Sequence, residues 1–438
     1  MIIIDRALEA REAAGHPIQV GLVGAGALGR GVARQFITSA TGQRLAAVAN
    51  RTVDRAAHAW TLSGADSPKV VDDPAALDAA IRAGRPVVTG DPLVLCASQE
   101  IDAIIEATGT TEYGARVALA AIEGGKHVFI NAELEATLGP ILAAKAQERG
   151  VIVSSLDGDQ PGTEVNLFRW VRSMGFEPLV CGNIKGLQDH YRTPDTQAGF
   201  AERYGLTAKM ATSFADGTKI SFEQAVVGLS TGMRVAQRGM LGYAHDGHID
   251  DMTHRYDLDA IRAIGGIVDY ALGPKPGPGI YVFAAMADER QRAYLDFFKM
   301  GPGPLYSFYV PCHLAHMEAP SSVARAVLFD DPVTTPTMPN VEVITLAKRD
   351  LRAGETLDGI GGYLTYGSLD DALIARDQGL LPMGLAEDCR LVRDVPRDQA
   401  VTRADVELPE GRLADLLRRE QDERFDRVPV GCARSGPA

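Results

Sequence analysis

The chain has 438 residues, of which 46% are hydrophobic and 23% are charged, and its formal net charge is −13 at pH 7. This length predicts two or three domains, each long enough to bury a hydrophobic core. The acidic balance argues against nonspecific nucleic-acid binding, and no stretch approaches the roughly 18 apolar residues that a membrane span requires. The five scattered cysteines lack C-x-x-C spacing, and charge appears as early as Asp5, so we expect a protein of the reducing cytoplasm.

A glycine-rich motif stands near the N-terminus, between a predicted strand at 18–23 and a predicted helix at 30–39. Its pattern, G-x-G-x-x-G, is typical in this context of a Rossmann dinucleotide-binding unit. Gly24 would permit the tight turn, Gly26 would let the backbone approach a pyrophosphate, and Gly29 would allow the helix to pack closely on the strand. The helix N-terminus would add amide donors and a positive dipole for the phosphates. A glycine-rich turn without a ligand is the alternative, but we expect the nucleotide to contact Gly24, Ala25, Gly26, Ala27, Leu28 and Gly29.

The end of the next predicted strand, at 45–49, selects the nucleotide. An acidic residue there would hold the ribose 2′-hydroxyl and repel a 2′-phosphate, but the chain has Asn50, Arg51 and Thr52 instead. The planar guanidinium of Arg51 can pair with a phosphate, to which Asn50 and Thr52 can donate hydrogen bonds. The sequence therefore predicts NADP(H) rather than NAD(H). The alternative is that Arg51 only stacks on the adenine, which would suit either nucleotide.

Apolar runs alternate with amphipathic helices through residues 1–157. The remaining predicted elements are helices at 5–15, 54–63, 73–83, from 113 and at 138–147, and strands at 101–107, 127–130 and 151–155. The alternation predicts an α/β fold with a doubly wound parallel sheet, in which ligands bind beyond the carboxyl ends of the strands. Polar residues follow three of these ends, so Thr108, Gly109 and Asn131 are expected to contact the cofactor. A helix near 320–330 is expected to complete this Rossmann domain.

Residues 158–331 are expected to form an α+β catalytic and dimerisation domain whose sheet covers the Rossmann cleft. Its predicted elements are helices at 164–173 and 223–229 and strands at 207–214, 218–222, 280–285 and 305–310. The dipeptide Asp216-Gly217 predicts a hairpin turn between two of these strands. A proline-rich linker begins at Pro332. It leads to a small β-rich domain at 340–410 and then to an amphipathic helix and tail at 411–438.

The third part resembles the SAF domain of antifreeze proteins, sialic-acid synthases and sugar-acid dehydratases, through residues 347–367, 380–391 and 395–408. The rest resembles homoserine dehydrogenases and, more closely, the 1-deoxy-D-xylulose 5-phosphate reductoisomerase-like oxidoreductases. This likeness is carried by VGLVGAGALG, IDAIIEATG, GGKHVFINAE and DYALGPKPGPGIYVFA, at 20–29, 101–109, 124–133 and 269–284. The resemblance implies NADPH as cofactor, a divalent cation and a homodimer.

Three positions depart from the pattern of these families. Homoserine dehydrogenases carry Asn-Lys where this chain has Ala132-Glu133, and the reductoisomerase-like proteins carry a glutamate where it has Gln160. A lysine of the same family is replaced by Asn183, while the following Lys185 is kept. These changes favour a related protein that acts on a different small hydroxy or oxo substrate.

Hydride transfer needs a group that gives or takes the hydroxyl proton and positive charge near the developing alkoxide. Lys185, at the end of a predicted strand, is the first choice for this role; the alternative is a surface lysine at a sheet edge. Glu133 and Asp159 also follow predicted strand ends. They could hold Mg²⁺ or Mn²⁺ or orient the lysine, or they could simply cap the helices that follow.

A run rich in histidine and aspartate at 245–256 matches no metal signature and is expected to be a solvated loop, in which His254 is the best functional choice. His313 is a further catalytic candidate or a structural histidine, and Cys312 beside it is expected to be a packing residue. The sequence thus predicts a cytoplasmic NADP-dependent oxidoreductase acting on a small polar carbonyl or alcohol, phosphorylated or sugar-derived. The resemblance implies a reductoisomerase-like or homoserine dehydrogenase-like reaction and a homodimer or higher homo-oligomer. A non-catalytic protein that senses a nucleotide or sugar ligand is the alternative.

Overall fold

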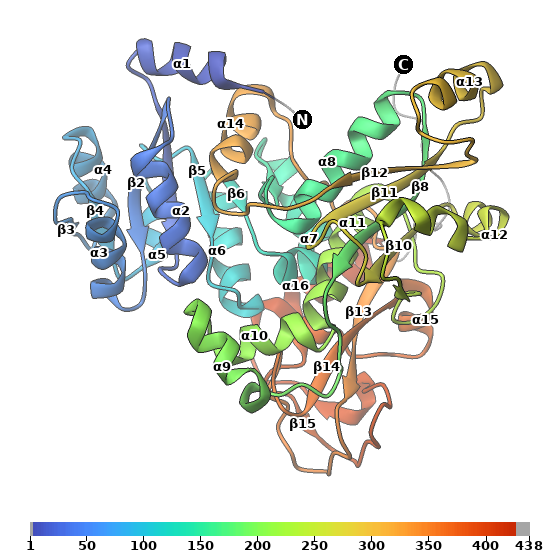
Figure 1. Cartoon of the computed structure of the whole chain (residues 1–438). Coiled ribbons are helices and arrows are strands. Elements are labelled where there is room, and N and C mark those ends of the chain that lie inside the picture. The colour runs from blue at the N-terminus through green and yellow to red at the C-terminus, as the bar shows by residue number, and fades with distance from the viewer. Residues whose placement is uncertain (1–2, 426–438) are drawn as a thin grey trace. The chain divides into compact units, whose positions relative to one another are not determined.

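The computed structural model describes residues 3–425, and its contacts divide the chain into two units. Unit 1 comprises Met1–Gly162 and Leu314–Thr335, and unit 2 comprises Thr163–His313 and Pro336–Ala438 (Figure 1). The predicted tail beyond residue 425, with Cys432, lies outside the described residues.

Unit 1 is built on a seven-stranded sheet in the order β3-β4-β2-β1-β5-β6-β7, in which all neighbouring strands are parallel. The central strands are short apolar runs buried on both faces, as parallel sheets require. The strands are β1 (Ile18–Val23), β2 (Gln43–Ala49), β3 (Lys69–Val70), β4 (Val87–Thr89), β5 (Ala103–Glu106), β6 (His127–Phe129) and β7 (Val153–Ser154). The predicted doubly wound parallel sheet is therefore confirmed.

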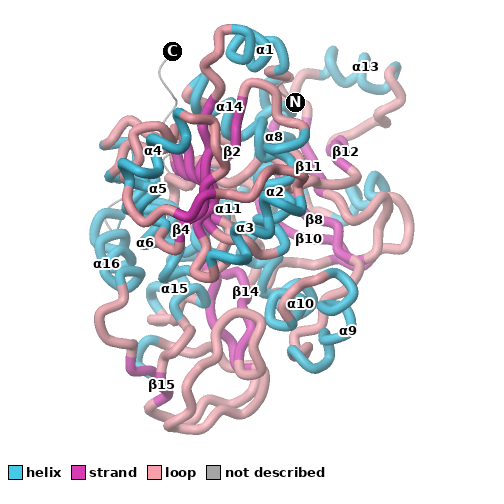
Figure 2. The backbone as a smooth tube through the Cα atoms, turned by 90° about the vertical axis from the view of Figure 1, so that its left-hand side faces the viewer, coloured by secondary structure: helices cyan, strands magenta, loops and turns pink. Residues whose placement is uncertain are grey.

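Two helical layers cover this sheet. Helices α3, α2 and α14 contact one another in that order, and α4, α5, α6 and α7 form the other series. Figure 2 shows β2 and β4 between α4, α5 and α6 on one side and α2 and α3 on the other. The helices are α1 (Asp5–Ala13), α2 (Ala27–Thr38), α3 (Val53–Leu62), α4 (Pro74–Arg82), α5 (Pro92–Cys96), α6 (Thr111–Glu123), α7 (Ala132–Glu148) and α14 (Ala319–Phe329).

Helix α14 belongs to unit 1, although in the sequence it follows residues 163–313 of unit 2. Its Arg325 is buried and pairs with Asp157, just beyond β7, and with Asp331 at 2.7 Å. Ser322 Oγ accepts a hydrogen bond from the backbone N–H of Asp157 at 2.7 Å. These contacts attach the returning segment to the carboxyl end of the sheet.

Unit 2 contains a mixed five-stranded sheet in the order β12-β11-β8-β10-β9. Strands β8 and β10 are parallel, whereas β11 runs antiparallel to both β8 and β12. The strands are β8 (Glu177–Lys185), β9 (Tyr243–Ala244), β10 (Ile267–Leu272), β11 (Ile280–Ala285) and β12 (Leu305–Val310). The predicted strands at 280–285 and 305–310 are confirmed.

Helix α11 (Thr218–Thr231) is the centre of unit 2. Eleven of its residues are buried, and it packs both on β8 and β10 and on the antiparallel pair β13 (Val341–Ala347) and β14 (Thr365–Asp371). The other helices before β13 are α8 (Gln160–Ser173), in which the unit boundary falls, α9 (Pro194–Tyr204), α10 (Ala208–Ala215), the 3₁₀ helix η1 (Ile249–Arg255), α12 (Leu258–Ile264) and α13 (Glu289–Phe297).

The region after β14 consists of short elements. They are α15 (Ala372–Asp377), η2 (Met383–Leu385), β15 (Arg390–Leu391), η3 (Arg403–Asp405), β16 (Val406–Glu407) and α16 (Leu413–Phe425). Strands β15 and β16 form a second small antiparallel pair. The two small antiparallel pairs lie within the stretch 340–410, whose contacts place it in unit 2; its standing as a separate domain stays a prediction.

The predicted strands at 207–214 and 218–222 are wrong, because both stretches are helical, in α10 and α11. Thr207 caps α10 by accepting a hydrogen bond from the backbone N–H of Met210 at 3.2 Å. Gly217, with φ of 91°, then turns the chain into α11. A β-type dipeptide thus joins two helices here. The first residues of α11 are buried together with the rest of the helix and show no one-sided apolar pattern, whereas the helix predicted at 223–229 lies within α11 and is confirmed. The expected loop at 245–256 likewise contains the 3₁₀ helix η1.

Candidate active site

The glycine loop of unit 1 has the geometry of a phosphate cradle. Gly24 adopts φ of 104°, a conformation that other residues rarely take. A Cβ on Gly29 would lie 2.1 Å from the carbonyl oxygen of Gly24, so only glycine allows this packing of α2 against the loop. A Cβ on Gly26, the N-cap of α2, would meet no atom within 4 Å, which leaves open space beside the first amides of the helix. The loop therefore fits a pyrophosphate group.

The residues at the end of β2 divide into one structural and two exposed side chains. Asn50 Oδ1 accepts a hydrogen bond from the backbone N–H of Ala25 at 3.2 Å, and its Nδ2 donates to the carbonyl oxygen of Thr52 at 2.7 Å. Asn50 thus ties the glycine loop to the end of β2. Arg51 and Thr52 are exposed at the same strand end, where a ribose phosphate could reach them.

Glu106, the last residue of β5, connects two of the predicted cofactor residues. Its Oε1 accepts hydrogen bonds from both the N–H (2.8 Å) and the hydroxyl of Thr108, and its Oε2 accepts one from Asn131 Nδ2 at 2.8 Å. Asn131 Oδ1 in turn caps α7 by accepting from the N–H of Leu134 at 2.9 Å. Burial raises the pKa of Glu106 to about 6, although the hydrogen bonds oppose this shift. From the sequence, Glu106 is expected among the polar residues at strand ends that line the crevice, without a role of its own; its signal is a carboxylate ending an apolar strand just before Thr108-Gly109.

The carboxylates predicted beyond the next two strands lie at helix starts. Glu133 is buried in the first turn of α7. Asp159 Oδ1 accepts a hydrogen bond of 3.0 Å from the backbone N–H of Gln160, the first residue of α8. Glu135, two residues further on in the same first turn of α7, is fully buried and accepts hydrogen bonds from the hydroxyls of Ser155 and Thr334. Burial raises the pKa of Glu135 to about 7.

In the part of the chain that the structure describes, no three histidine, cysteine, aspartate or glutamate side chains form a group that could hold a metal ion. Asp159 and Glu133 therefore do not form such a site with a third side chain among residues 3–425. The position of Asp159 before the first residue of α8 agrees with the alternative that this side chain caps the helix.

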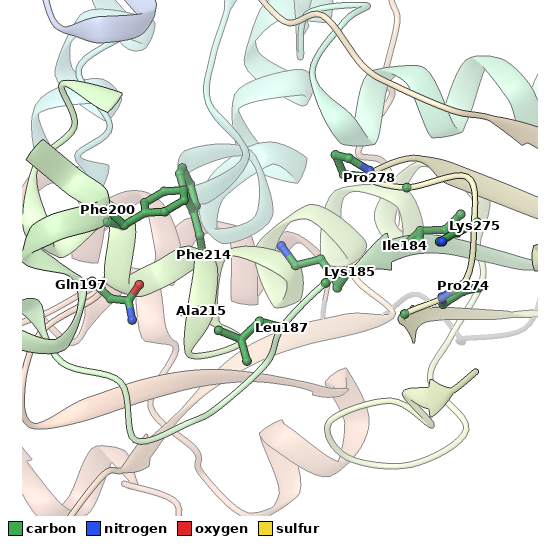
Figure 3. Close-up of a pocket in the computed structure, with 14 residues that line it drawn as sticks. Ile184, Lys185, Leu187, Gln197, Phe200, Phe214, Ala215, Pro274, Lys275 and Pro278 are labelled. Atoms are coloured by element: carbon green, nitrogen blue, oxygen red, sulfur yellow. The ribbon is translucent and has the colours of Figure 1, made fainter. Parts of the chain in front are cut away.

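Unit 2 contains a cavity of about 560 Å³ at the carboxyl end of β8. Lys185 ends this strand, and its side chain extends between two groups of residues in Figure 3. Gln197 and Phe200 of α9 and Phe214 of α10 lie on one side of it, and Pro274, Lys275 and Pro278 lie on the other. The lining residues are Ile184, Lys185, Gly186, Leu187, Gln197, Phe200, Ala211, Phe214, Ala215, Gly273, Pro274, Lys275, Gly277 and Pro278.

This cavity offers two cationic side chains against mainly apolar walls. Lys185 is partly buried and Lys275 is exposed, and two cations beside apolar walls suit a small ligand that carries an anionic group. The sequence interpretation selected Lys185 but missed Lys275, which lies in the turn-rich segment at 273–279 and has no strong local signal. The helical wall residues were missed because the stretch 207–214 was read as a strand.

The two predicted histidines lie elsewhere in unit 2. His254 is exposed in η1, and His313, which is partly buried, follows β12. Neither is among the described residues that line the cavity. Cys312 is exposed and is therefore not the packing residue that the sequence suggested.

Two family models match successive parts of the chain. Residues 18–155 match "Oxidoreductase family, NAD-binding Rossmann fold", and residues 158–319 match "Oxidoreductase DRL, catalytic domain". The chain is therefore an oxidoreductase. More particularly, an NAD-binding Rossmann domain of the GFO/IDH/MocA type precedes a DRL catalytic domain.

These matches are coarser than the resemblance drawn from the sequence. They do not identify the chain as a homoserine dehydrogenase or as a 1-deoxy-D-xylulose 5-phosphate reductoisomerase, and neither match extends over the SAF-like residues. The comparison with curated proteins finds no significant match. Among residues 3–425, no helix has both the length and the apolar character needed to cross a membrane.

Solved structures of dehydrogenases overlap with most of the chain at low identity. A probable dehydrogenase from Thermotoga maritima is 12% identical, with 72% of this chain and 90% of that chain covered and a TM-score of 0.40. A scyllo-inositol dehydrogenase from Lactobacillus casei is 11% identical (72% and 91% covered, TM-score 0.42). The UDP-N-acetylglucosamine 3-dehydrogenase GnnA from Acidithiobacillus ferrooxidans is 15% identical (73% and 92% covered, TM-score 0.41).

Proposed function

We propose that this chain is an NADP-dependent oxidoreductase that interconverts a carbonyl and an alcohol on a small anionic substrate, phosphorylated or derived from a sugar acid. The observation that carries the proposal is the cavity at the end of β8, where Lys185 and Lys275 face apolar walls. The reductoisomerase-like reaction is one member of this class.

The choice of NADP rests on the end of β2. No carboxylate occupies the position that would hold a ribose 2′-hydroxyl, since Asn50 stands there and is engaged with the glycine loop. Arg51 and Thr52 are exposed and can pair with a 2′-phosphate. The cradle at Gly24–Gly29 would hold the pyrophosphate, and Thr108, Gly109 and Asn131 would contact the nicotinamide side. The bound nucleotide would supply or accept the hydride.

Lys185 is the residue we propose to exchange a proton with the substrate oxygen. A protonated amine donates to the developing alkoxide and stabilises its charge in a low-dielectric site. Lys275, on the other side of the same cavity, would bind the anionic group and so orient the substrate. His254 and His313 are kept only as weaker candidates for substrate contact, since other residues line the cavity.

Further parts of the proposal come from the sequence pattern, namely the domain boundaries at 157, 331 and 410 and a cytoplasmic location. Others come from the resemblance, namely the SAF identity of 340–410 and a homodimer or higher homo-oligomer. Four cysteines among the described residues are free thiols, which agrees with a reducing compartment. We derive no step through a divalent cation, because Glu133 and Asp159 lack a third described ligand.

The test begins with the cofactor. A calorimetric or fluorescence titration should give tighter binding for NADPH than for NADH, and absence of binding for both would overturn the proposal. A screen of phosphorylated and carboxylated hydroxy and oxo compounds, with NADPH and NADP⁺ and with and without Mn²⁺, should then identify turnover.

A pair of matched variants tests the cavity. Lys185→Ala should lower kcat by about a hundredfold or more, the range for general acid–base groups, without changing NADPH affinity. Lys275→Ala should mainly raise KM for the anionic substrate. If Lys185→Ala left turnover intact, its proposed role would be wrong; if the parent bound NADPH but turned over no substrate, the non-catalytic sensor would be favoured.

A further inference from the structure

One wall of the cavity is a pair of helices. Helix α9 contributes Gln197 and Phe200, and α10 contributes Ala211, Phe214 and Ala215. The two helices pack on each other, and the connection that begins at Lys185 leads directly into α9. The position of this helix pair therefore sets the width of the cavity opposite Lys185.

Residues 340–410, here called the C-terminal segment, contact the N-terminal turns of both helices. Tyr363 donates a hydrogen bond through its hydroxyl to Asp195 Oδ1, in the first turn of α9, at 2.8 Å. Lys209 Nζ, in the first turn of α10, donates to the carbonyl oxygen of Asp358 at 2.6 Å. Gly361 lies so close to α10 that a Cβ there would be 1.9 Å from the carbonyl oxygen of Lys209. The contact at α10 is therefore one that only glycine permits.

A buried lysine of the same segment fixes the other end of the wall. Lys348 is only 5% exposed, and its Nζ lies 2.8 Å from Oδ2 of the fully buried Asp216. Asp216 directly follows Ala215, the last lining residue of α10, and its Oδ1 accepts a hydrogen bond from the N–H of Thr218 at the start of α11. The ion pair thus holds the turn between α10 and α11.

The same ammonium group makes two further hydrogen bonds, one of them to another chain segment. Lys348 Nζ donates at 2.7 Å to the carbonyl oxygen of Arg192, in the connection between Lys185 and α9, and at 2.7 Å to that of Gly362. A buried ammonium group is stable only where oxygen atoms replace its hydration shell, so these partners specify one geometry. Lys348 consequently joins three segments: the strand-to-α9 connection, the α10–α11 turn and the C-terminal segment.

We propose that the C-terminal segment is the positioning element of the substrate cavity and that Lys348 is its central positioning residue. The proposal rests on the proposed function in taking this cavity as the substrate site. The segment holds α9 and α10 at a fixed distance from Lys185, so it determines which substrates fit, although it contributes no lining residue of its own. Its loss should therefore affect substrate binding more than the chemical step.

The experiment compares variants of the full-length protein. Lys348→Met combined with Asp216→Asn removes both charges of the buried pair, so that no carboxylate is left buried without its cation. Tyr363→Phe removes one exposed hydrogen bond to α9 and tests the same idea with little risk to folding. Arg352→Met is the matched control, since Arg352 pairs with Asp394 at 2.8 Å within the C-terminal segment itself.

Hydrogen exchange of peptides covering residues 194–215 is the first readout, because it needs no substrate. The double variant should exchange at least about tenfold faster there, Tyr363→Phe about twofold to fivefold faster, and Arg352→Met at the parent rate. Unchanged exchange in the double variant, with a folded protein by circular dichroism, would overturn the proposal. If the double variant does not fold, the comparison of Tyr363→Phe with Arg352→Met decides in the same way.

Kinetics supply the second readout. KM for the substrate should rise at least about fivefold in the double variant, while kcat changes about twofold or less and NADPH affinity stays at the parent value. Faster exchange at 194–215 with unchanged KM would overturn the positioning role. Should the parent show no turnover, the proposed function fails, and labelling of Lys185, which is partly buried, by acetic anhydride replaces KM, with the exposed Lys275 as reference. Faster labelling of Lys185 relative to Lys275 in the double variant supports the positioning role, and an equal ratio contradicts it.

Discussion

Asn131 donates a hydrogen bond to the buried carboxylate of Glu106 over 2.8 Å, and the same carboxylate accepts two from Thr108. Three donors on one carboxylate favour its ionised form, yet burial outweighs them and raises its pKa to about 6. Protonation below this pH should loosen Thr108 and Asn131. We therefore predict that NADPH affinity falls as the pH drops through about 6, measured by titration between pH 5 and 8.

The variant Glu106→Gln tests the origin of this pH dependence. Its amide presents a donor where the carboxylate accepts, so NADPH should bind about tenfold more weakly at pH 8, and the step near pH 6 should disappear. A variant that keeps the step would assign it to another group. The carboxylate shift also implies that Glu106 itself favours folding below pH about 4.5 and that this contribution is lost as the pH rises through about 6.

The 2′-phosphate preference has its own pair of variants. Arg51→Ala should weaken NADPH by about tenfold to a hundredfold, the worth of a charge-assisted hydrogen bond, and leave NADH almost unchanged. Asn50→Asp keeps the acceptor for the N–H of Ala25 but adds a negative charge beside the ribose, so it should shift the preference toward NADH. Equal losses for both nucleotides in Arg51→Ala would favour adenine stacking instead.

The parts of the fold that local patterns specify were predictable. The glycine motif, the apolar strands around it and the helix at 319–329 all have short-range signals, and the structure confirms the parallel sheet that they imply. Helix α10 and the first turn of α11, at 218–222, were not predictable in this way, although the helix predicted at 223–229 lies within α11. The alternation of apolar and polar residues and the dipeptide Asp216-Gly217 favoured strands. In the folded chain this stretch is instead part of a helix, α11, which is buried between two sheets.

The site follows the same division. Lys185 was selected because it ends a strand, which is a local feature. Lys348 and Asp216 are separated by 132 positions, and no spacing in the sequence indicates that they pair. Lys275 and the aromatic residues of α9 and α10 likewise meet only in the folded chain. Side-chain contacts of this range depend on tertiary packing.

Glu135 should make unit 1 less stable at alkaline pH. Because burial raises its pKa to about 7 from an ordinary value of 4.5, the folded protein holds this proton more tightly than the unfolded chain. The stabilisation is complete below pH about 4.5 and is lost as the pH rises through about 7. Glu135→Gln, which cannot ionise, should therefore be more stable than the parent at pH 8 by up to about 3 kcal/mol, at about 1.4 kcal/mol per pKa unit.

Denaturant unfolding at pH 5 and pH 8 checks this prediction. The gain in Glu135→Gln should be present at pH 8 and small at pH 5, because a neutral carboxyl and an amide both bond to the hydroxyls of Ser155 and Thr334. A gain or loss of equal size at the two pH values would show that packing, rather than ionisation, accounts for the difference.

The two glycines Gly26 and Gly29 should separate folding from nucleotide binding. A Cβ at position 29 would lie 2.1 Å from the carbonyl oxygen of Gly24, so Gly29→Ala should lower the free energy of unfolding by about 1–3 kcal/mol, as overpacking does. At position 26 a Cβ meets no atom within 4 Å, and φ of −72° suits alanine, so Gly26→Ala should keep the parent stability. Its methyl group would occupy the space of the pyrophosphate and weaken NADPH by at least about tenfold. Thermal melts and NADPH titrations of both variants give the comparison, and undiminished NADPH binding by a folded Gly26→Ala variant would place the nucleotide elsewhere.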